Sequence, residues 1–394
     1  MAGTVILSGA RTPIGKLSGS LASLSAVDLG AVAIKEALTR AGVTPEQVDY
    51  VFMGHVLQAG QGQITARQAA AGASIPMDTP STTVNKVCLS GMNAIYLADL
   101  MINAGEADIV VAGGMESMTR APYLLDQARQ GYRLGNATIV DSMMYDGLTC
   151  AFDHCAMGKA TDSYNTATVV SRERQDAFAA LSHERAANAQ KNGRFALEIA
   201  PVSIPQRKGD PVTVDSDEGI RPGTTAESLS GLKPAFSPDG TITAGNASQI
   251  SDGAAAVIVT SRDTAERLGA EPLGEISGYG QVAGPNASLL HQPSSAIRKA
   301  LERAGRSIGD VDLFEINEAF AAVGLASMDD LGIDSQVCNL NGGAIALGHP
   351  LGASGARLVV TSLYEMKARG AALGAAGLCG GGGQGDAIIL SATR

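Results

Sequence analysis

Two stretches of the chain share one pattern of apolar and polar positions, and each predicts an amphipathic helix followed by a strand. Residues 33–49 read AIKEALTRAGVTPEQVD and residues 296–312 read AIRKALERAGRSIGDVD, so nine of the 17 positions are identical. In each copy apolar residues recur at helical spacing up to a glycine, and a short apolar run follows at residues 50–53 or 313–316. We therefore expect the same helix–strand unit twice in the fold.

The repeat extends beyond these helices. A Ser-Gly pair at residues 90–91 recurs at 354–355, and an Ala-Gly pair at 112–113 recurs at 376–377, each 264 residues later. The helix copies at 33 and 296 are 263 residues apart, so three matches stand in order at a nearly constant offset. Self-similarity of this kind indicates a duplicated domain.

Apolar runs predict a sheet that is covered on both faces. Residues 108–112 and 255–260 are apolar apart from Asp108 and Thr260 at their ends, and residues 4–8 predict a first strand. Strands without an apolar–polar alternation are typical of sheets that lie between two layers of helices. The fold class is therefore α/β.

A stretch of different texture separates the two halves, and we interpret it as an inserted loop domain. Between residues 119 and 247 the chain is polar and interrupted by Pro and Gly, with one long helical pattern at 172–191. We expect residues 1–118 with 248–270 to form the N-terminal half, and 271–394 the C-terminal half. Long insertions into compact folds are commonly functional.

Composition narrows the class of protein. Apolar residues make up 45% of the chain, which is typical of a globular protein. With 394 residues the chain is longer than a single hydrophobic core usually supports, so more than one domain is expected. The net charge of −10 argues against nucleic acid as a partner. The five cysteines contain no CxxC pair and predict neither a disulfide framework nor a metal site, and no apolar run is long enough for a membrane. The first ten residues do not predict a signal peptide, so we expect a cytoplasmic protein.

Cys88 is the first candidate nucleophile. It follows a β-like run at residues 82–87 and precedes an apolar helical pattern that ends near Asn103. The N–H groups at a helix N-terminus favour a thiolate, so we expect the pKa of this thiol to be lowered. A cysteine that only fills the core is the alternative interpretation.

Three further segments supply partners for this thiol. His349 lies in NGGAIALGHPLGASG, where small neighbours would admit a ligand. Cys379 ends a predicted strand and precedes four glycines, which would expose its thiol and several backbone N–H groups. Asn317, in EINEAF, could enter a site or cap the next helix. Glycine-rich turns without chemistry are the alternative interpretation for the loops.

Two thiols and an imidazole suit Claisen chemistry on thioesters. One thiolate holds an acyl group while the imidazole takes its proton. A second acid/base must remove a proton next to a thioester carbonyl, and a thiol with a pKa near neutrality suits that step. Glycine N–H groups and an asparagine can stabilise the oxyanions.

Taken together, these motifs resemble the thiolase family over essentially the full chain, most closely its bacterial acetyl-CoA acetyltransferases. VCLSGMNAI, VAGGMESMT, NEAFAA, NGGAIALGHPLGASGAR and CGGGGQGDA stand in family order. The resemblance implies the five-layered αβαβα thiolase fold, with two similar halves and an inserted loop domain, assembled as a homotetramer or homodimer. It also implies an acyltransferase that converts two acetyl-CoA to acetoacetyl-CoA and CoA, with coenzyme A thioesters as substrates and no permanently bound cofactor or metal.

The resemblance also implies a role for each catalytic candidate. Cys88 matches the nucleophile that becomes acetylated, and His349 matches the base that activates it. Cys379 matches the acid/base that acts on the second substrate. Asn317 matches the residue that holds an oxyanion-hole water beside His349. The backbone N–H groups of Cys88 and Gly381 match the second oxyanion hole.

Coenzyme A binding in the family falls largely on the loop domain. This acidic chain has local positive charge there, at Arg207, Lys208, Arg221 and Lys233. Arg221 matches the arginine that stacks on adenine. The other residues that match positions along the nucleotide, pantetheine and acyl path are Ser228, Ala244, Ser248, Leu148, Met157, Ala319 and Phe320. An ordinary surface or turn role is the alternative for each.

One departure from the family pattern concerns the acyl pocket. Biosynthetic members often carry His-Met-Gly there, whereas this chain has Ala156, Met157 and Gly158. Ala156 removes a polar ring and opens volume, so we expect tolerance of longer 3-oxoacyl chains. A degradative 3-oxoacyl-CoA thiolase is therefore one alternative function, and an inactive protein that binds CoA thioesters is the second.

Overall fold

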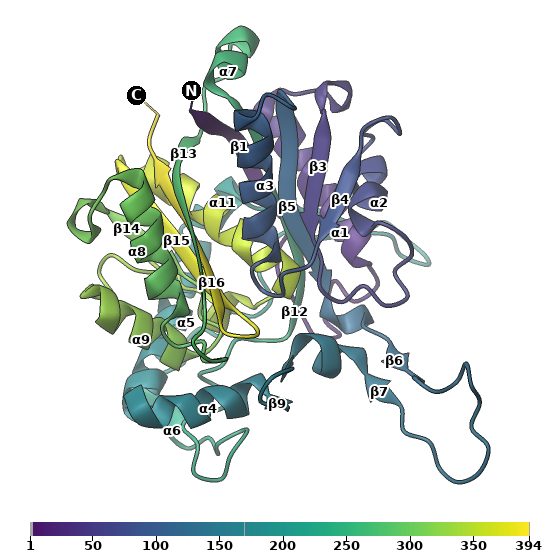
Figure 1. Ribbon diagram of the computed structural model, residues 1–394, viewed down its shortest axis with the longest axis vertical. Helices are drawn as coiled ribbons and strands as arrows, with labels where there is room; N and C mark the ends of the chain where they lie inside the picture. The colour runs from purple at the N-terminus through teal and green to yellow at the C-terminus, as the bar shows by residue number, and fades with distance from the viewer. Residues whose placement is uncertain (1–2, 169, 394) are drawn as a thin grey trace.

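The computed structural model describes residues 3–168 and 170–393 and is built around one long mixed sheet (Figure 1). The strands of this sheet are β1 (Thr4–Arg11), β2 (Gly15–Lys16), β3 (Tyr50–Gly54), β4 (Ser81–Val84), β5 (Ile109–Ser117), β12 (Ser251–Ser261), β13 (Gly274–Ala283), β14 (Leu313–Ile316), β15 (Leu373–Gly380) and β16 (Gln384–Ser391). They run in the order β14–β15–β16–β13–β1–β12–β5–β3–β4, and β2 pairs with β12 off this path.

The sheet consists of two parts that meet at one short pairing. β1 and β13 pair antiparallel only through Val5 with Glu275 and Ile6 with Gly274. On one side of this junction β3 is parallel to β4 and β5, and on the other side β14 is parallel to β15. The predicted strands at residues 50–53 and 313–316 are thus found at equivalent places, as the sequence repeat indicates.

Helices form three layers around the two parts of the sheet. Those outside the inserted stretch are α1 (Ala26–Ala41), α2 (Thr65–Gly72), α3 (Ser90–Asn103), α7 (Arg262–Leu268), α8 (Gln292–Ala304), α9 (Ala321–Leu331), α10 (Ala344–Leu347) and α11 (Leu351–Arg369). α3 and α11 lie between the two parts of the sheet, α1 and α2 cover the outer N-terminal face, and α8 and α9 cover the outer C-terminal face. The order of layers is therefore αβαβα.

Successive side chains of one strand enter different hydrophobic clusters. In β12, Ala256 and Ile258 pack in the cluster around α1, while Val257 and Val259 pack in the cluster around α3 and α11. Neighbouring side chains of a strand point to opposite faces, so a strand covered on both faces must be apolar throughout. This confirms the interpretation of the continuous apolar runs.

The repeated Ser-Gly pairs lie where α3 crosses α11. A Cβ atom on Gly91 would lie 2.7 Å from the carbonyl oxygen of Gly352, and a Cβ atom on Gly355 would lie 2.5 Å from the backbone nitrogen of Met92. The two backbones touch, so only glycine fits at either position. This crossing brings the first turns of both helices together, one following Cys88 and the other following His349.

The stretch between β5 and β12 lies outside the large sheet. Its elements are β6 (Tyr123–Leu124), β7 (Val140–Asp141), a π-helical turn (Met143–Gly147), β8 (Thr149–Cys150), β9 (Cys155–Ala156), α4 (Met157–Thr168), α5 (Arg172–Lys191), β10 (Val202–Ile204), β11 (Val212–Val214) and α6 (Ala226–Ser230). Its described strands form only two-stranded pairs. α5 spans the predicted helix, whereas the domain boundaries at 119 and 247 stay a prediction.

Among the described residues, no helix combines the length and the apolar character that crossing a membrane requires.

Candidate active site

Cys88 lies in a tight turn between β4 and α3. The backbone N–H of Lys86 donates to Oγ of Ser90 at 2.8 Å, and the N–H groups of Leu89 and Ser90 donate to carbonyls within the same turn. Val87 has a φ of 51°, in the left-handed region that β-branched residues rarely adopt. The predicted β-like run to residue 87 therefore ends early, because the chain turns to present the thiol.

The pKa of Cys88 shifts in the opposite direction from the sequence prediction. Burial raises the pKa of this thiol to about 12, and the charge of Glu116 also raises it. The backbone N–H groups of Cys88 itself and of Gly381 hydrogen-bond the sulfur and lower the pKa in part. The N–H of Ser90, the first residue of α3, already donates to the carbonyl of Val87 within the turn. The expected thiolate is therefore wrong for the resting protein, and Cys88 is a neutral thiol.

His349 is buried, and both ring nitrogens have partners. Nδ1 lies 2.6 Å from Oγ of Ser354, which donates its own proton to the carbonyl of Pro350 at 2.9 Å. A hydroxyl has one proton, so Nδ1 must supply the hydrogen for the first contact, and Nε2 is left as an acceptor. Nδ2 of Asn317 lies 3.4 Å from Nε2. The imidazole can therefore take up a proton at Nε2.

Burial lowers the pKa of His349 to about 3, and the positive charge of Arg357 lowers it as well. The imidazole is therefore unprotonated at every pH above about 4. We expect the base-dependent step of catalysis, and therefore kcat/KM for thiolysis of acetoacetyl-CoA, to change little between pH 7 and pH 5. A histidine of ordinary pKa would be mostly protonated at pH 5, and kcat/KM would then be roughly 30-fold lower than with a fully unprotonated imidazole. A decline centred near pH 6.5, in protein that circular dichroism shows to be folded, would contradict this assignment.

Ser354 is expected to position His349. In Ser354→Ala the Nδ1 proton loses its acceptor, so the ring and its tautomer are no longer fixed, and we expect kcat to fall about tenfold or more while KM changes little. The matched control is Ser362→Ala, on the same helix, because Ser362 is equally buried and its Oγ has no hydrogen-bond partner in the described part of the chain. Equal losses of kcat in both variants would assign the effect to packing instead.

Asn317 lies beside His349 and does not cap the next helix. Phe320 occupies the N-cap position of α9 and makes no side-chain capping bond, so the capping alternative is wrong. The backbone N–H of Asn317 donates to the carbonyl of Gly377 at 3.0 Å, which fixes the residue against β15. Its Oδ1 is buried without a partner among the described residues. Such an acceptor is suited to a water molecule or a substrate group.

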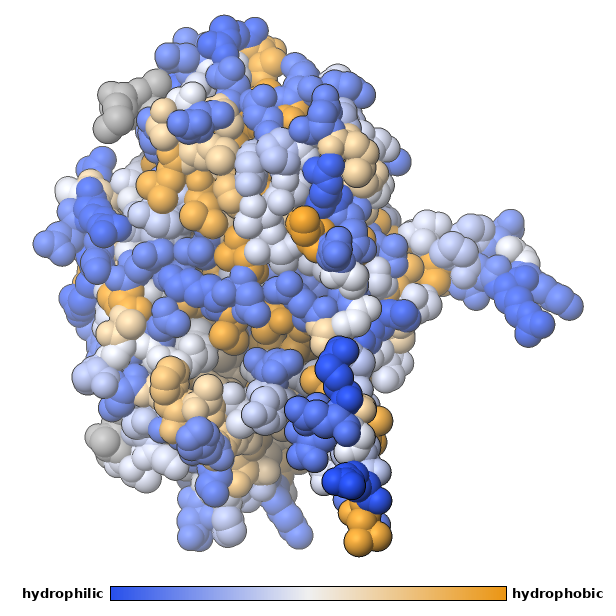
Figure 2. Space-filling model, turned by 45° about the vertical axis from the view of Figure 1, so that its right-hand side comes forward, coloured by the Kyte–Doolittle hydropathy of each residue, from blue (hydrophilic) through white to orange (hydrophobic). Residues whose placement is uncertain are grey.

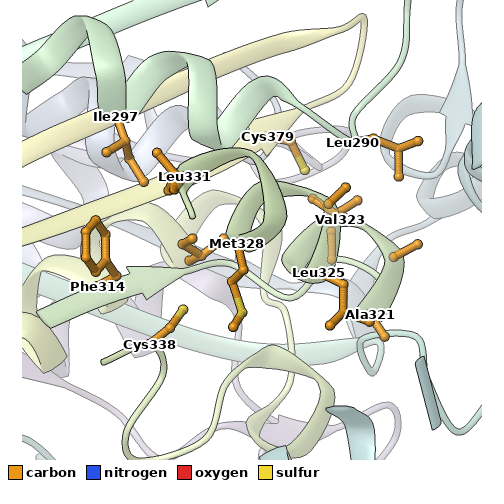
Figure 3. Packing of buried hydrophobic residues seen from close by; sticks show 14 of the residues in the cluster. Leu290, Ile297, Phe314, Ala321, Val323, Leu325, Met328, Leu331, Cys338 and Cys379 are labelled. Atoms are coloured by element: carbon orange, nitrogen blue, oxygen red, sulfur yellow. The ribbon is translucent and has the colours of Figure 1, made fainter. Parts of the chain in front are cut away.

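Cys379 is on β15 and is only 1% exposed, so the expected exposure of this thiol is wrong. Figure 3 shows its side chain beside α9, among the apolar residues of the C-terminal half. Burial raises the pKa of Cys379 well above its usual value, and the neighbouring Cys88 adds to the rise. The expected pKa near neutrality is therefore also wrong. The two thiols nevertheless lie close enough for the charge of one to affect the pKa of the other, as expected if both belong to one site.

Sequence reasoning missed an ion pair that joins the two cysteine loops. Nζ of Lys86 lies 2.8 Å from Oδ1 of Asp386, and the hydroxyl of Tyr279 donates to Oδ2 of Asp386 at 2.7 Å. Lys86 precedes Cys88 by two residues, and Asp386 follows the glycine turn after Cys379. The pair therefore holds the two loops at a fixed separation. Its only sequence signal was the aspartate inside CGGGGQGDA.

A second missed residue is Glu116, at the end of β5. Its carboxylate accepts backbone N–H groups of Val56 and Leu57 at 3.1 Å and of Gly352 at 2.9 Å, and Nε2 of His55 lies 3.3 Å away. These bonds tie the segment after β3 to the first turn of α11. They stabilise the crossing that brings Cys88 and the His349 loop together.

A cavity of about 480 Å³ gathers most of the residues predicted to bind coenzyme A. The predicted residues on its wall are Leu148, Met157, Arg221, Ala244, Ser248 and Phe320. Cys88 packs in one cluster with Leu148 and Ile250, which both line the cavity. Lys16 also lines it and was missed by sequence reasoning. Arg221 and Lys16 are the cations on this wall in the described chain.

The remaining predicted binding residues lie off the cavity wall. Ala319 supports the wall through its backbone, since its carbonyl accepts the N–H of Ser248 at 3.1 Å. The hydroxyl of Ser228 exchanges hydrogen bonds with the backbone of Thr225 at the start of α6.

The predicted positive patch is not gathered at the cavity. Arg207 and Lys208 lie in the turn between β10 and β11, and Val202 and Ile204 of this pair pack in the cluster around α1. Lys233 is exposed but does not line the cavity either.

Two models of known protein families match this chain. Residues 4–263 match the family model of the thiolase N-terminal domain, and residues 270–392 match that of the thiolase C-terminal domain. The chain belongs to the thiolase family. Family membership confirms the predicted thiolase fold and makes the chain an acyltransferase, as the motifs indicated.

Individual thiolases are similar over their full length. A protein of Mycolicibacterium smegmatis named "Probable acetyl-CoA acetyltransferase" is 56% identical over 386 residues, covering 98% of this chain and 100% of that protein. The "Acetyl-CoA acetyltransferase" of Cupriavidus necator is 52% identical over 390 residues, covering 99% of each. The crystal structure of the Bacillus anthracis acetyl-CoA acetyltransferase has a TM-score of 0.97 at 40% identity, covering 100% of this chain and 99% of that one. The roles of the individual site residues stay predictions.

Proposed function

We propose that this thiolase is an acetyl-CoA C-acetyltransferase that interconverts two acetyl-CoA with acetoacetyl-CoA and CoA through an acyl-enzyme on Cys88. The observation that carries this proposal is the pair of neighbouring thiols, with the Gly381 N–H bonded to the sulfur of Cys88. The names of the similar full-length proteins support the same substrate.

The first step is acyl transfer to Cys88. Its sulfur attacks the thioester carbonyl, the carbon–sulfur bond to CoA breaks, and CoA leaves with a proton. The pKa of the thiol is about 12 and that of His349 is about 3, so a stable thiolate–imidazolium pair is disfavoured before attack. We infer that the proton moves to Nε2 of His349 while the new carbon–sulfur bond forms, and that it then passes to the departing sulfur of CoA.

The second step is carbon–carbon bond formation. Cys379, as a thiolate, removes the α proton of a second acetyl-CoA, and the resulting enolate carbon attacks the acyl carbon and displaces Cys88. A raised pKa makes the thiolate of Cys379 scarce but strongly basic, which suits a weak carbon acid. In the reverse direction, thiolysis, the neutral thiol donates its proton to the departing carbon. The resting state of Cys379 is the form that thiolysis uses.

Thiolysis tests the proposal directly. Mixing the protein with acetoacetyl-CoA and CoA should consume the acetoacetyl-CoA and form two acetyl-CoA per molecule consumed. Tight binding of acetoacetyl-CoA without any consumption would instead favour the inactive CoA-thioester binder.

A degradative thiolase for longer chains is the second candidate, and Ala156 favours it. Ala156 lies on the cavity wall beside Met144, Leu148 and Met157, where a histidine ring would occupy volume. We expect thiolysis of 3-oxohexanoyl-CoA as well as acetoacetyl-CoA. In Ala156→His the rate with the longer substrate should fall about tenfold more than the rate with acetoacetyl-CoA. No turnover of 3-oxohexanoyl-CoA by the unaltered protein would sink this prediction.

We further propose that the protein assembles as a homotetramer, with a homodimer as the alternative. β6 and β7 lie on an arm that projects from the body (Figure 1). Figure 2 shows apolar surface on this side of the molecule. The large apolar residues exposed along the arm are Tyr123, Leu125, Tyr132, Leu134 and Ile139. Exposed apolar groups of this kind mark contact surfaces. Light scattering that gives the mass of one 40.0 kDa chain would contradict assembly.

The expected cytoplasmic location and the expected lack of a resident cofactor stay predictions. Among residues 3–168 and 170–393, no three His, Cys, Asp or Glu side chains are placed to hold a metal ion together.

A further inference from the structure

Two cysteines outside the catalytic set lie opposite each other in the hairpin of β8 and β9. The antiparallel register pairs Cys150 with Cys155 and Thr149 with Ala156. Directly opposed residues of such a pair point to the same face, with Cβ atoms about 4.5–5.5 Å apart. Cys150 and Cys155 pack in one small hydrophobic cluster, and both are free thiols. We propose that they form a reversible disulfide that regulates turnover at the adjacent active site.

The register sets the geometry of this disulfide. The backbone N–H of Met157 donates to the carbonyl of Leu148 at 2.9 Å, so this is a hydrogen-bonded pair of the ladder. Hydrogen-bonded and non-hydrogen-bonded pairs alternate, which makes Cys150 and Cys155 a hydrogen-bonded pair with Cα atoms about 5.5 Å apart. Disulfides accept this Cα separation but need a Cβ separation near 3.8 Å, so the hairpin must adjust. Strained disulfides are the easily reduced, regulatory kind.

The two thiols differ in access, which orders the reaction. Cys155 is half-buried, whereas Cys150 is only 1% exposed. The oxidant is a small disulfide such as glutathione disulfide. The sulfur of Cys155 attacks it, forms a mixed disulfide and releases one glutathione thiolate. The sulfur of Cys150 then attacks the sulfur of Cys155 and releases the second glutathione. Two protein thiols are oxidised, one glutathione disulfide is reduced to two thiols, and the two protons end on the released glutathione.

Formation of this bond changes the turn between the strands. Sγ of Cys150 accepts the backbone N–H of Asp153 at 3.3 Å, and this contact competes with a bond to Cys155. The same turn carries Phe152, whose ring lies 2.9 Å from the place of a Cβ on Gly382. Phe152 therefore covers the glycine turn directly beside Gly381, the donor to the sulfur of Cys88.

The hairpin also borders both cavities of this region. Cys150, Phe152 and Gly381 line one cavity of about 570 Å³. Ala156, next to Cys155, lines the cavity of about 480 Å³, and Met157 lines both. A disulfide that shifts this hairpin would therefore move the acyl pocket and the glycine turn together. We expect the oxidised protein to turn over more slowly.

Disulfide formation is tested without any reliance on the proposed function. Cys88→Ala protein, incubated with glutathione disulfide and digested without reduction, should yield a peptide that links Cys150 to Cys155, and the intact mass should fall by about 2 Da. A link from either cysteine to Cys379, or glutathione retained on Cys155 without a link, would overturn the proposal.

Regulation is tested by activity, and this arm rests on the proposed function. Unaltered protein is oxidised in excess acetyl-CoA, which keeps Cys88 acylated, and is then assayed for thiolysis before and after dithiothreitol. We expect a loss that dithiothreitol reverses. Cys155→Ser should keep its activity under oxidation, and Cys338→Ser, which removes a buried cysteine away from the hairpin, should respond like unaltered protein. An identical loss in Cys155→Ser would overturn the regulatory role. If Cys155→Ser does not fold, Cys150→Ser replaces it, judged by the same ratio of oxidised to reduced activity.

Discussion

Cys88→Ala is expected to lower the rate of acetoacetyl-CoA thiolysis by about 10⁴-fold. The backbone N–H groups of Cys88 and Gly381 hydrogen-bond the sulfur of Cys88, and alanine leaves no nucleophile in its place. Alanine keeps the Cβ atom and removes only the half-buried sulfur, so the turn held by Lys86 and Ser90 should remain. The residual rate would come from substrate binding alone.

Acyl transfer between CoA and Cys88 can be measured without the condensation step, and it tests the Cys88→Ala variant more specifically. Exchange of labelled CoA into acetyl-CoA needs only the acyl-enzyme, so Cys88→Ala should abolish it. Cys338→Ala is the matched control, because it removes a fully buried thiol of the C-terminal half that is not part of the site. Exchange that persists in Cys88→Ala at the unaltered rate would refute the nucleophile assignment.

Cys379→Ala is expected to lower thiolysis and condensation by about 10³-fold while leaving CoA exchange nearly intact. The neutral thiol of Cys379 supplies the proton to the departing carbon in thiolysis, and its thiolate removes the α proton in condensation. Neither event occurs during exchange between CoA and acetyl-CoA. The separation of the two reactions distinguishes an acid/base from a group that only supports the fold.

Structural damage would produce a different pattern. Cys379 is 1% exposed within an apolar cluster, so its loss also leaves a small cavity, and a destabilised protein would lose exchange and thiolysis together. Thermal unfolding of the variant measures that contribution. Parallel loss of both reactions in a protein of unchanged melting temperature would remove Cys379 from the acid/base role.

Much of the fold could be predicted because its determinants are local or repeated. The two helix copies repeat one pattern, and the apolar runs at 108–112 and 255–260 and the helix at 172–191 are each visible within a single segment. The repeated Ser-Gly pairs also marked the contact of α3 with α11, where Gly91 and Gly355 let the backbones touch.

The electrostatics of the site could not be predicted, because burial depends on segments that are distant in the chain. A helix start beside Cys88 indicated a lowered pKa, yet the packing of both halves raises it to about 12. The pair of Lys86 with Asp386 joins residues 300 positions apart, and neither has a distinctive local pattern. Lys16 reaches the cavity wall from a two-residue strand that no periodicity reveals. By contrast, the short spacing of Cys150 and Cys155 was visible, and only the register of β8 with β9 gives it meaning.

The central claim is that an acyl group resides on Cys88 during turnover. The most direct test is to mix the protein with acetoacetyl-CoA, quench with acid within the first turnovers and measure the intact mass and the peptide masses. The account predicts an increase of about 42 Da, one acetyl group, confined to the peptide that contains Cys88. Acetyl on a different residue, or steady thiolysis with no covalent acetyl at any quench time, would contradict it.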